Sequence, residues 1–394
     1  MAVSTAPPLP SSKQAASKQE DLYRASQWQL MWWRFQQHKP ALISVFVLML
    51  AYLIAIFAEV AAPHDPNRFS AKWVLSPPMR IHFVDSEGTF HWRPFVYGLQ
   101  SERDMTTLAM VVVPDETQIY PLYFFVKGDS YKFWGLFPWD RHLFGIQVPD
   151  EVPSESATAF VSDPMLYLLG ADELGRDMLS RIIYGARVSL SIGLLGVALS
   201  LVLGVVLGGI SGYYGGVVDV IIQRIIEFLR SLPAIPLWLT LAAVLPPNWS
   251  AIRIYFGITV ILSLIGWTGL ARVVRGRFLS LREEDFILAA QLSNAPRMRI
   301  ILRHMVPSFT SHLIAHLTLA IPAMILSETA LSFLGLGLQP PVVSWGVLLQ
   351  GAQNFRSVAL APWLLLPGLF VVIAVLAFNF AGDGLRDAAD PYAI

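Results

Sequence analysis

The chain has 394 residues and no formal net charge, and 55% of its residues are hydrophobic whereas only 14% are charged. Its mean hydropathy of +0.54 is too high for an ordinary soluble domain and predicts an integral membrane protein. The absence of cysteine excludes disulfides and thiolate metal sites, and the balanced charge gives no indication of a nucleic acid partner.

Residues 1–39 are predicted to be an N-terminal tail on the cytoplasmic side. The first 20 of them are rich in Ser, Ala, Pro and Gln, a composition typical of disorder. A first transmembrane helix is expected at 40–61, because about 20 apolar residues cross the hydrocarbon core of a bilayer. This stretch lies too deep in the chain, and is too long, for a cleaved signal peptide, so it is interpreted as an uncleaved anchor.

Residues 62–170 are a polar insertion, expected outside the membrane. A structureless loop of that length is uncommon, so we expect a small, mostly β domain with strands at 110–116 and 119–128. The aromatic side chains of residues 133–146 are predicted to fill its core. The alternative is that these aromatics form an exposed surface for a partner.

Five further transmembrane helices are expected in the second half of the chain. The predicted spans are residues 188–210, 231–246, 252–271, 311–334 and 360–381. The span at 231–246 has the shortest apolar run and is crowded by Pro233 and Pro236. Small residues at four-residue spacing in the span at 188–210 are predicted to let helices pack closely; they are Gly193, Gly196, Gly204 and Gly208. The predicted fold is an all-α polytopic membrane protein with six transmembrane helices and a β insertion between the first two.

The distribution of arginine predicts the orientation in the membrane. Residues 272–309, between the fourth and fifth predicted spans, contain far more arginine than the other short loops. These arginines are Arg272, Arg275, Arg277, Arg282, Arg297, Arg299 and Arg303. Because positively charged loops stay in the cytoplasm, we expect this connection and both termini to be cytoplasmic and the insertion to lie outside.

The middle of this connection has the pattern of a polar helical hairpin. Ser280 and Glu283 have the spacing of a capping box, which predicts a helix over about 281–292. Asn294 is expected where the chain reverses, because Asn tolerates the left-handed backbone conformation, and Pro296 suits the first turn of a second helix. Such a hairpin is a candidate docking surface for a cytoplasmic partner. The alternative is an amphipathic hairpin that lies on lipid headgroups.

Several motifs resemble one family of transporters. Residues 285–307 resemble the cytoplasmic "EAA" loop of ABC importer permeases. The stretches LGADELGRDMLSRIIYGARVSL, GYYGGVVD, SETALSFLGLGLQPPVVSWGVLL and LAFNFAGDGLRDAADP are similar to the dipeptide/oligopeptide permeases, specifically to their C-type subunit. The loop differs from the family pattern at Leu288 and Asn294, where the family has Glu and Gly. Leu288 removes a carboxylate from the contact with the ATPase, whereas Asn294 can still make the turn.

The resemblance implies a permease subunit of an ATP-driven importer of peptides or similar oligomeric solutes in the bacterial inner membrane. The implied partners are a homologous second permease, two cytoplasmic ATP-binding subunits, a periplasmic substrate-binding protein and membrane lipid. The implied core is 171–394, with a coupling loop at 275–309. The residues implied to dock the ATPase are Asp285, Phe286, Leu288, Ala289, Ala290, Asn294, Arg297, Arg299 and Arg303. The outer insertion is larger than the loop usual in the family.

The chain is not expected to hydrolyse ATP itself. A phosphate-binding loop needs a lysine directly after a glycine, and no Gly-Lys pair occurs in the sequence. We therefore expect ATP and Mg²⁺ on partner subunits, and no cofactor or metal on this chain. His304, His312 and His316 share helical spacing, so metal binding stays open as an alternative to helix packing.

The candidate residues for a solute pathway are Ser327, Glu328 and Thr329. A carboxylate at membrane depth is costly and often functional, but Glu328 could equally pair with a neighbouring helix. The competing functional class is a channel or secondary transporter without ATPase partners, which would require internal repeats and buried ion-coupling residues. An oligosaccharide and a nickel complex remain alternative substrates. No set of nucleophile, base and orienting group is evident, so an intramembrane enzyme is not expected.

Overall fold

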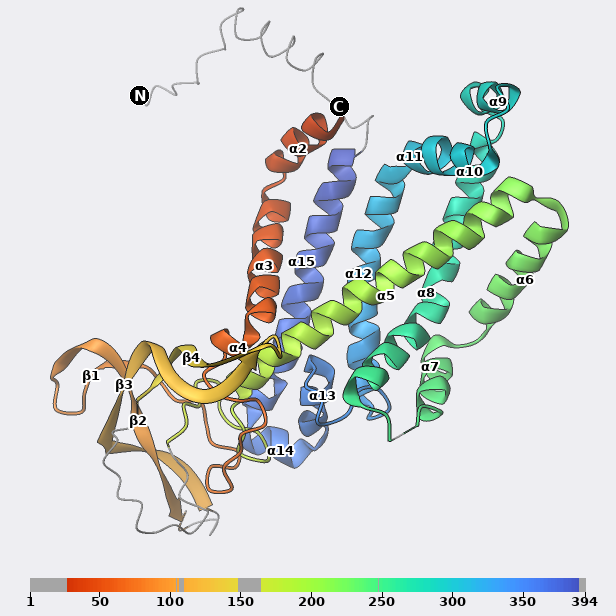
Figure 1. Cartoon of the computed structure of the whole chain (residues 1–394). Coiled ribbons are helices and arrows are strands. Elements are labelled where there is room, and N and C mark those ends of the chain that lie inside the picture. Colours follow the sequence, from red (N-terminus) through yellow and green to blue (C-terminus); the bar gives the residue numbers. More distant parts are fainter. Residues whose placement is uncertain (1–26, 104, 106–109, 148–163, 247, 390–394) are drawn as a thin grey trace, which may run out of the picture.

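The computed structural model describes residues 27–103, 105, 110–147, 164–246 and 248–389. Long helices form a bundle, and a β-sheet extends sideways from one end of it (Figure 1). The predicted disorder of residues 1–20 concerns a segment outside the described residues.

Within the described residues, five helices are long and apolar enough to cross a membrane. They are α3 (Lys39–Ile56), α5 (Met178–Tyr214), α8 (Ala251–Leu281), α12 (Thr310–Phe333) and α15 (Leu366–Ala389). α5 packs along α8 and α12, while α15 packs along α12 and α3. The chain is therefore a multi-pass membrane protein, as its composition predicts.

The span predicted at 231–246 is not a straight helix. Its apolar stretch is divided between the end of α6 (Gly216–Ser231) and α7 (Ala234–Ala243), which are bent by 89° relative to each other. Pro233 lies at the break, where it cannot donate a helical hydrogen bond. With 10 residues, α7 is about 15 Å long, which is half of the hydrocarbon thickness. By length and composition, the described part of the chain thus has five candidate spans, or up to six if the bent pair counts as one.

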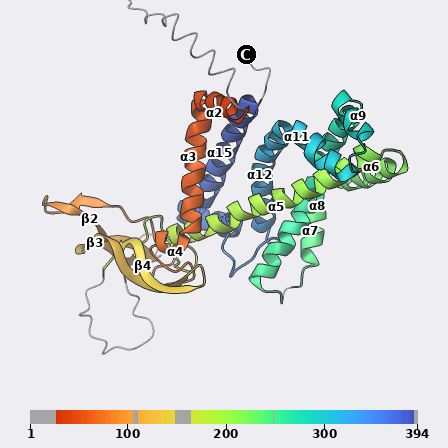
Figure 2. The same ribbon diagram turned by 45° about the horizontal axis from the view of Figure 1, so that its top comes forward.

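α5 is much longer than the span predicted at 188–210. It begins at Met178 because the Asp177 carboxylate accepts hydrogen bonds from the backbone N–H groups of Leu179 and Ser180 and so caps the helix. It ends at Gly215, whose φ of 64° is a conformation that glycine adopts without steric cost. Its 37 residues make about 56 Å of helix, and Figure 2 shows it running from α4 (Ala58–Ala61) to α6.

The small residues of α5 permit close helix packing within the chain. A Cβ at Gly193 would lie 2.8 Å from the Ile325 side chain of α12. A Cβ at Gly208 would lie 2.8 Å from the Ala271 Cα of α8. Both distances are shorter than carbon atoms tolerate, so only glycine fits, and the predicted packing role is confirmed with α8 and α12 as the partners.

Short helices occupy the two ends of the bundle. α2 (Gln27–Gln37) lies at the same end as the last turns of α15 and the hairpin helix α9 (Asp285–Leu292) (Figure 1). α4, α13, α14 and the β-sheet lie at the opposite end. The bounds at that end are α4 (Ala58–Ala61), α13 (Trp345–Leu349), η2 (Gln350–Gln353), α14 (Phe355–Leu360) and η3 (Pro362–Leu365).

The insertion contains a four-stranded antiparallel sheet in the order β1-β2-β3-β4. The strands are β1 (His82–Val84), β2 (Phe90–Arg103), β3 (Met110–Phe133) and β4 (Phe137–Ile146). The two strands predicted at 110–116 and 119–128 are one continuous strand, β3. Its pairing with β2 shifts register between Tyr97 and Gly98. This irregularity lies where the sequence predicts the end of one strand and the start of the next.

The prediction that the aromatics of residues 133–146 fill the core is wrong for most of them. Trp134, Phe137 and Trp139 are each more than half exposed. The buried clusters form around Leu166 and Tyr167, and Phe144 is the aromatic of this range that packs against one of them. A single sheet buries only the side chains that a second layer covers, and within the described residues this layer covers only part of the sheet.

Asp129 on β3 joins the sheet to the segment that follows the first span. Its carboxylate accepts a hydrogen bond from Arg68 Nη1 at 2.6 Å and another from the Asp65 backbone N–H at 3.0 Å. Burial alone would raise the pKa of this carboxyl, but the neighbouring His64 side chain, the Asp65 backbone N–H and the Arg68 charge together hold the pKa well below its ordinary value. Nearby, both Nη atoms of Arg187 donate to the Glu59 carboxylate, at 2.7 and 2.5 Å.

Candidate functional site

The predicted docking hairpin forms the end of the molecule opposite the β-sheet, and α9 protrudes from the bundle there (Figure 1). The side chain of Leu292 is 89% exposed, and those of Phe286 and Leu288 are 45% and 44% exposed. Ile287 between them is completely buried. α9 therefore exposes apolar side chains to its surroundings, while the buried Ile287 attaches it to the rest of the protein.

A compact apolar cluster connects α9 to two spanning helices. Ile287 packs in this cluster with Phe278 of α8 and with Phe309 and Leu313 at the start of α12, and Ala290 is partly buried against it. Because a close-packed interior transmits displacement instead of absorbing it, a movement of α9 must move the adjacent ends of α8 and α12.

The hairpin begins later than the predicted capping box. Ser280 lies inside α8, which continues to Leu281, and α9 starts at Asp285 after a turn. No side-chain hydrogen bond caps α9. The prediction fails because α8 stays packed through Phe278, which keeps its last turns helical, so that residues 275–281 of the predicted loop belong to α8.

The reversal occurs where the sequence predicts it. Asn294 has φ 56°, the left-handed conformation, and Pro296 is the N-cap of the next helix, α10. The second arm consists of α10 (Arg297–Ile300), the π-helical turn η1 (Ile301–Met305) and α11 (Val306–Ser308). Pro307 in α11 has no N–H to donate to the preceding turn, which favours the wider π geometry there.

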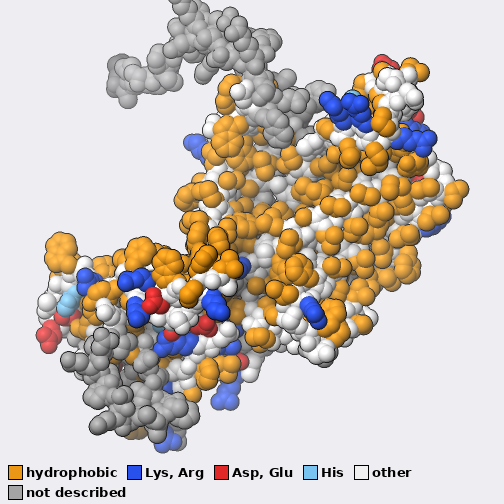
Figure 3. Space-filling view, viewed as in Figure 1, with side chains coloured by type: hydrophobic (Ala, Val, Ile, Leu, Met, Phe, Trp, Pro, Cys, Tyr) orange, Lys and Arg blue, Asp and Glu red, His pale blue; other side chains and the backbone are white. Residues whose placement is uncertain are grey.

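Arginine surrounds the hairpin, and Figure 3 shows positively charged side chains gathered beside it. Arg297, Arg299 and Arg303 are exposed, and the Arg297 guanidinium lies 5.8 Å from the centre of the Tyr214 ring. Asp285 is exposed in the first turn of α9, where a negative charge suits the helix dipole. Of the nine residues predicted to dock the ATPase, all but the partly buried Ala290 are exposed on this hairpin.

Sequence reasoning missed an ion pair beside the hairpin. Arg275 of α8 donates from Nε and Nη2 to the two carboxylate oxygens of Asp219 on α6, both at 2.5 Å. The Ser211 hydroxyl of α5 donates to the same carboxylate at 2.5 Å. These bonds tie α5, α6 and α8 together at one point, and no spacing rule could have paired residues 56 positions apart.

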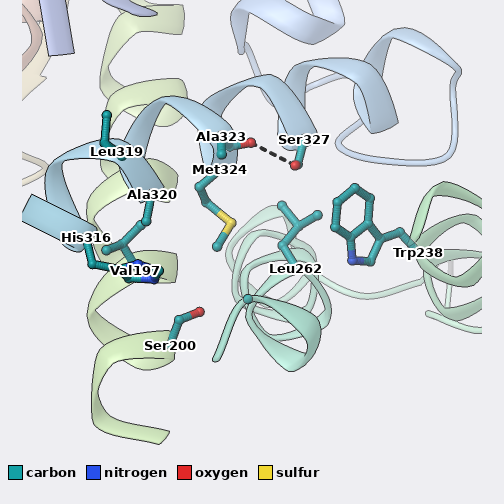
Figure 4. A pocket seen from close by; sticks show the side chains of 11 residues that line it. Val197, Ser200, Trp238, Leu262, His316, Leu319, Ala320, Ala323, Met324 and Ser327 are labelled. Atoms are coloured by element: carbon teal, nitrogen blue, oxygen red, sulfur yellow. Dashed lines mark hydrogen bonds between the residues drawn. The ribbon is translucent and has the colours of Figure 1, made fainter. Parts of the chain in front are cut away.

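A cavity of about 490 Å³ lies between α5, α7, α8 and α12. Figure 4 shows Trp238, His316, Met324 and Ser327 among the side chains that line it. The wall is mostly apolar, and the Ser327 hydroxyl donates to the Ala323 carbonyl at 2.8 Å. Such an apolar wall with a few polar groups is typical of small-molecule sites.

Of the three candidate pathway residues, only Ser327 lines this cavity. Glu328 has no exposed surface and Thr329 is 8% exposed. The Glu328 carboxylate accepts hydrogen bonds from three hydroxyls, on three different elements. The donors are Ser344 at 2.8 Å, Ser332 at 2.9 Å and Ser189 at 3.3 Å. This geometry favours the alternative in which Glu328 pairs with neighbouring helices.

The three histidines do not converge on one point. The ring of His312 contacts the guanidinium of Arg277, while His316 lines the cavity. Within the part of the chain that the structure describes, no group of three His, Asp or Glu side chains is placed to hold a metal ion.

Comparison with known proteins matches both helical parts of the chain. Residues 204–393 match the family "Binding-protein-dependent transport system inner membrane component". Residues 26–78 match "N-terminal TM domain of oligopeptide transport permease C". The sheet of the insertion lies between these two matches.

Curated relatives agree with the family matches. The chain is 42% identical over 226 residues to the oligopeptide transport system permease protein OppC of Escherichia coli K12, which covers 57% of this chain and 72% of that protein. It is 40% identical over 226 residues to OppC of Haemophilus influenzae, and this match covers 57% of this chain and 70% of that protein. It is 34% identical over 295 residues to the dipeptide transport system permease protein DppC of Haemophilus influenzae, and this match covers 69% of this chain and 97% of that protein.

Among solved structures, the MetNI methionine ABC transporter in an inward-facing conformation covers 54% of this chain and 98% of the chain compared, with 17% identity and a TM-score of 0.43. That overlap is too weak to add to the assignment. The family matches and the curated relatives suffice, since they extend over α2, α3 and the bundle that carries the hairpin. The chain belongs to the inner membrane permease components of binding-protein-dependent ABC importers, and within them to the C-type permeases of peptide systems.

Proposed function

We propose that this chain is one of two transmembrane subunits of an ATP-driven importer that takes up peptides or similar oligomeric solutes. The other subunits are a homologous second permease, two cytoplasmic ATP-binding subunits and a binding protein outside the inner membrane. ATP and Mg²⁺ bind to the ATP-binding subunits, in keeping with the absence of a Gly-Lys pair from this chain. The hairpin and both termini face the cytoplasm.

One observation carries the proposal: α9 combines exposed apolar side chains with a rigid attachment to two spanning helices. Leu292 and Phe286 are exposed for a partner, and Ile287 is buried between the ends of α8 and α12. ATP binding draws the ATP-binding subunits together and displaces α9. The displacement passes through the cluster around Ile287 into α8 and α12.

Leu288, which stands where the family has Glu, makes this contact less polar. Leu288 is 44% exposed and lies on the same face of α9 as Leu292, four residues further on, so this part of the docking surface is apolar, with arginines on the second arm of the hairpin. A matching groove on the ATP-binding subunit would be apolar with an acidic rim. The free energy of docking then comes mainly from burial of these side chains, at about 1.5–3 kcal/mol for each fully buried leucine or phenylalanine.

The cavity is the proposed wall of the solute pathway. It lies between α8 and α12, the two helices that α9 would move, and it opens on a mostly apolar surface with Ser327 and His316 as polar groups. A peptide offers backbone amides to such groups and apolar side chains to the rest of the wall. Relatives named as oligopeptide and dipeptide permeases support a peptide as the solute.

The test is uptake of a labelled peptide into vesicles that contain the chain, the second permease, the ATP-binding subunits and the binding protein. We expect uptake to require ATP. Leu292→Asp should abolish it and weaken binding of the ATP-binding subunit at least about 30-fold, because burying an unpaired carboxylate costs 2 kcal/mol or more. Leu360→Asp is the matched control, since Leu360 is 62% exposed on α14 at the opposite end, and it should leave subunit binding unchanged. Uptake driven by an ion gradient without the ATP-binding subunits would contradict the proposal.

A further inference from the structure

The turn between β3 and β4 exposes large apolar side chains. Trp134 is 54% exposed, Leu136 is 70% exposed and Phe137 is 62% exposed. These residues, 133–137, are called the hairpin tip below. Contiguous exposed apolar groups of this size are costly in water and mark a surface that contacts something else.

The tip is attached to the end of the first transmembrane helix. The Trp134 indole Nε1 donates a hydrogen bond to the Ile56 carbonyl at 2.9 Å. The Phe133 ring stacks on Phe57 with their centres 5.9 Å apart. The position of the tip relative to the bilayer is therefore set by the depth of Ile56 and Phe57.

That depth follows from the length of α3. The helix has 18 residues, Lys39–Ile56, so it is about 27 Å long, slightly less than the thickness of a hydrocarbon core of about 30 Å. Since α3 needs its whole length to cross, Ile56 must lie at the boundary between hydrocarbon and headgroups. Trp134, bonded to Ile56, lies at the same level.

The exposed surface of the tip continues the lipid-facing stripe of α3. This stripe has alternating spacings of three and four residues and consists of Ile43, Phe46, Leu50, Leu53 and Phe57, all exposed. Its last member, Phe57, is the residue against which Phe133 and Trp134 pack. Figure 3 shows hydrophobic side chains running from α3 onto the adjacent surface of the sheet.

The strand register adds aromatic residues on one face of the hairpin. Tyr131 pairs directly with Trp139, and Phe133 pairs with Phe137, so these side chains share a face because directly paired residues of antiparallel strands do. Lys132 and Arg141 are exposed on the same hairpin. Tryptophan and tyrosine at headgroup depth, with basic residues for lipid phosphates, are the usual composition of a membrane interface anchor.

We propose that the hairpin tip inserts into the interfacial region of the outer leaflet and anchors the insertion flat against the membrane beside α3. This lipid contact goes beyond the permease function and does not depend on it. It explains why aromatics that the sequence predicts as core are exposed, since lipid replaces the missing second layer.

The absence of cysteine from the chain makes a direct test available. An environment-sensitive fluorophore is attached to the cysteine of Leu136→Cys. The labelled chain is assembled with the other subunits, which must lack reactive cysteine, and the complex is reconstituted into lipid nanodiscs. Phe355→Cys is the matched control, because Phe355 is 87% exposed on α14, which lies beyond the ends of the spanning helices in Figure 1. Fluorescence is recorded with spin-labelled lipids quenching at the headgroup, and separately with iodide in the buffer.

We expect headgroup-labelled lipid to quench the probe at residue 136 at least about twofold more than the probe at residue 355, as for an interfacial side chain. Iodide should show the reverse order. Equal quenching of both probes by iodide, with no lipid effect, would overturn the proposal. Protection of residue 136 that appears only when the binding protein is added, again without a lipid effect, would also overturn it and identify a protein contact.

Discussion

At the scale of single residues, Glu328 shows how the bundle accommodates a carboxylate at membrane depth. Its oxygens accept hydrogen bonds from Ser189 of α5, Ser332 of α12 and Ser344 at the start of α13. The same two serines, Ser189 and Ser344, also accept backbone N–H groups of α13 at Trp345 and Val347. Because an unsatisfied polar group in this environment costs several kcal/mol, the network helps to hold α13 against the long helices, together with the apolar packing of Trp345 and Leu348.

Replacement of Glu328 separates its two proposed roles. Glu328→Ala leaves three hydroxyls without their acceptor and creates a hole, so the free energy of unfolding should fall by about 2–4 kcal/mol. Glu328→Gln keeps the shape and one acceptor oxygen, so the loss should be clearly smaller. Thermal unfolding in detergent measures both. If Glu328→Ala unfolds like the parent protein but changes which solutes are taken up, the pathway role is correct and the structural one is not.

Asp129 gives a prediction about pH. Its pKa is lowered in the folded protein, so its ion pair contributes stability that is complete above the ordinary carboxyl pKa and declines as the pH falls below about 3.9. Asp129→Asn should lower the unfolding temperature at neutral pH, because a neutral amide replaces the carboxylate that accepts hydrogen bonds from Arg68 and from the Asp65 backbone N–H.

The difference between Asp129→Asn and the parent protein should shrink as the pH falls below about 3.9, because the unfolded parent chain then binds a proton at this carboxyl that the folded protein, with its lowered pKa, does not bind. Asp140→Asn is the control, because its ion pair with Lys127 at 3.7 Å lies between two well-exposed side chains and contributes little. A difference that grows as the pH falls would show that the charge of Asp129 is not what stabilises the sheet.

At the scale of elements, helix packing in the bundle depends on the absence of side chains at specific points. Gly208 of α5 contacts the backbone of Ala271 on α8, with no space for a Cβ, whereas a Cβ at Gly276 would meet nothing within 4 Å. Both residues lie inside long helices, so their backbone conformations are alike and only their surroundings differ.

Two matched substitutions test this packing. Gly208→Ala should lower the unfolding temperature, because α5 and α8 must separate to admit a methyl group; overpacking of this kind costs about 1–3 kcal/mol. Gly276→Ala should be neutral or should stabilise the protein by up to about 1 kcal/mol, the difference in helix propensity. Equal effects of the two substitutions on thermal unfolding would refute the assigned contact between α5 and α8.

The sequence predicts those elements whose signal is local. Five spans follow from apolar length, and the reversal at Asn294 follows from the preference of that residue, since neither depends on distant neighbours. The bend between α6 and α7, the Asp219–Arg275 pair and the continuation of α8 past Ser280 depend on tertiary packing, which no local pattern contains. Aromatic content likewise does not say what covers a side chain, so the sequence could not predict that the aromatics of the β3–β4 hairpin are exposed.

At the scale of the whole molecule, two distinct ends are joined by helices that cross the membrane. One end carries α9 with its exposed leucines and arginines, and the other carries the β-sheet, α13 and α14 (Figures 1 and 3). The cavity between α5, α7, α8 and α12 lies within the helical bundle that joins these ends. The proposed function requires that force enter at the first end and that solute enter at the second.

The most direct test of the claim that α9 docks a cytoplasmic ATP-binding subunit is side-specific labelling combined with cross-linking at Leu292→Cys. Leu360→Cys in the same cysteine-free chain is the control. In intact cells, a reagent that does not cross the inner membrane should label residue 360 and leave residue 292 unlabelled. In inside-out vesicles, residue 292 should become accessible and should cross-link to the ATP-binding subunit, with a yield that changes when ATP is added. Labelling of residue 292 from the outside, or an intact complex in which it never meets that subunit, would contradict the account.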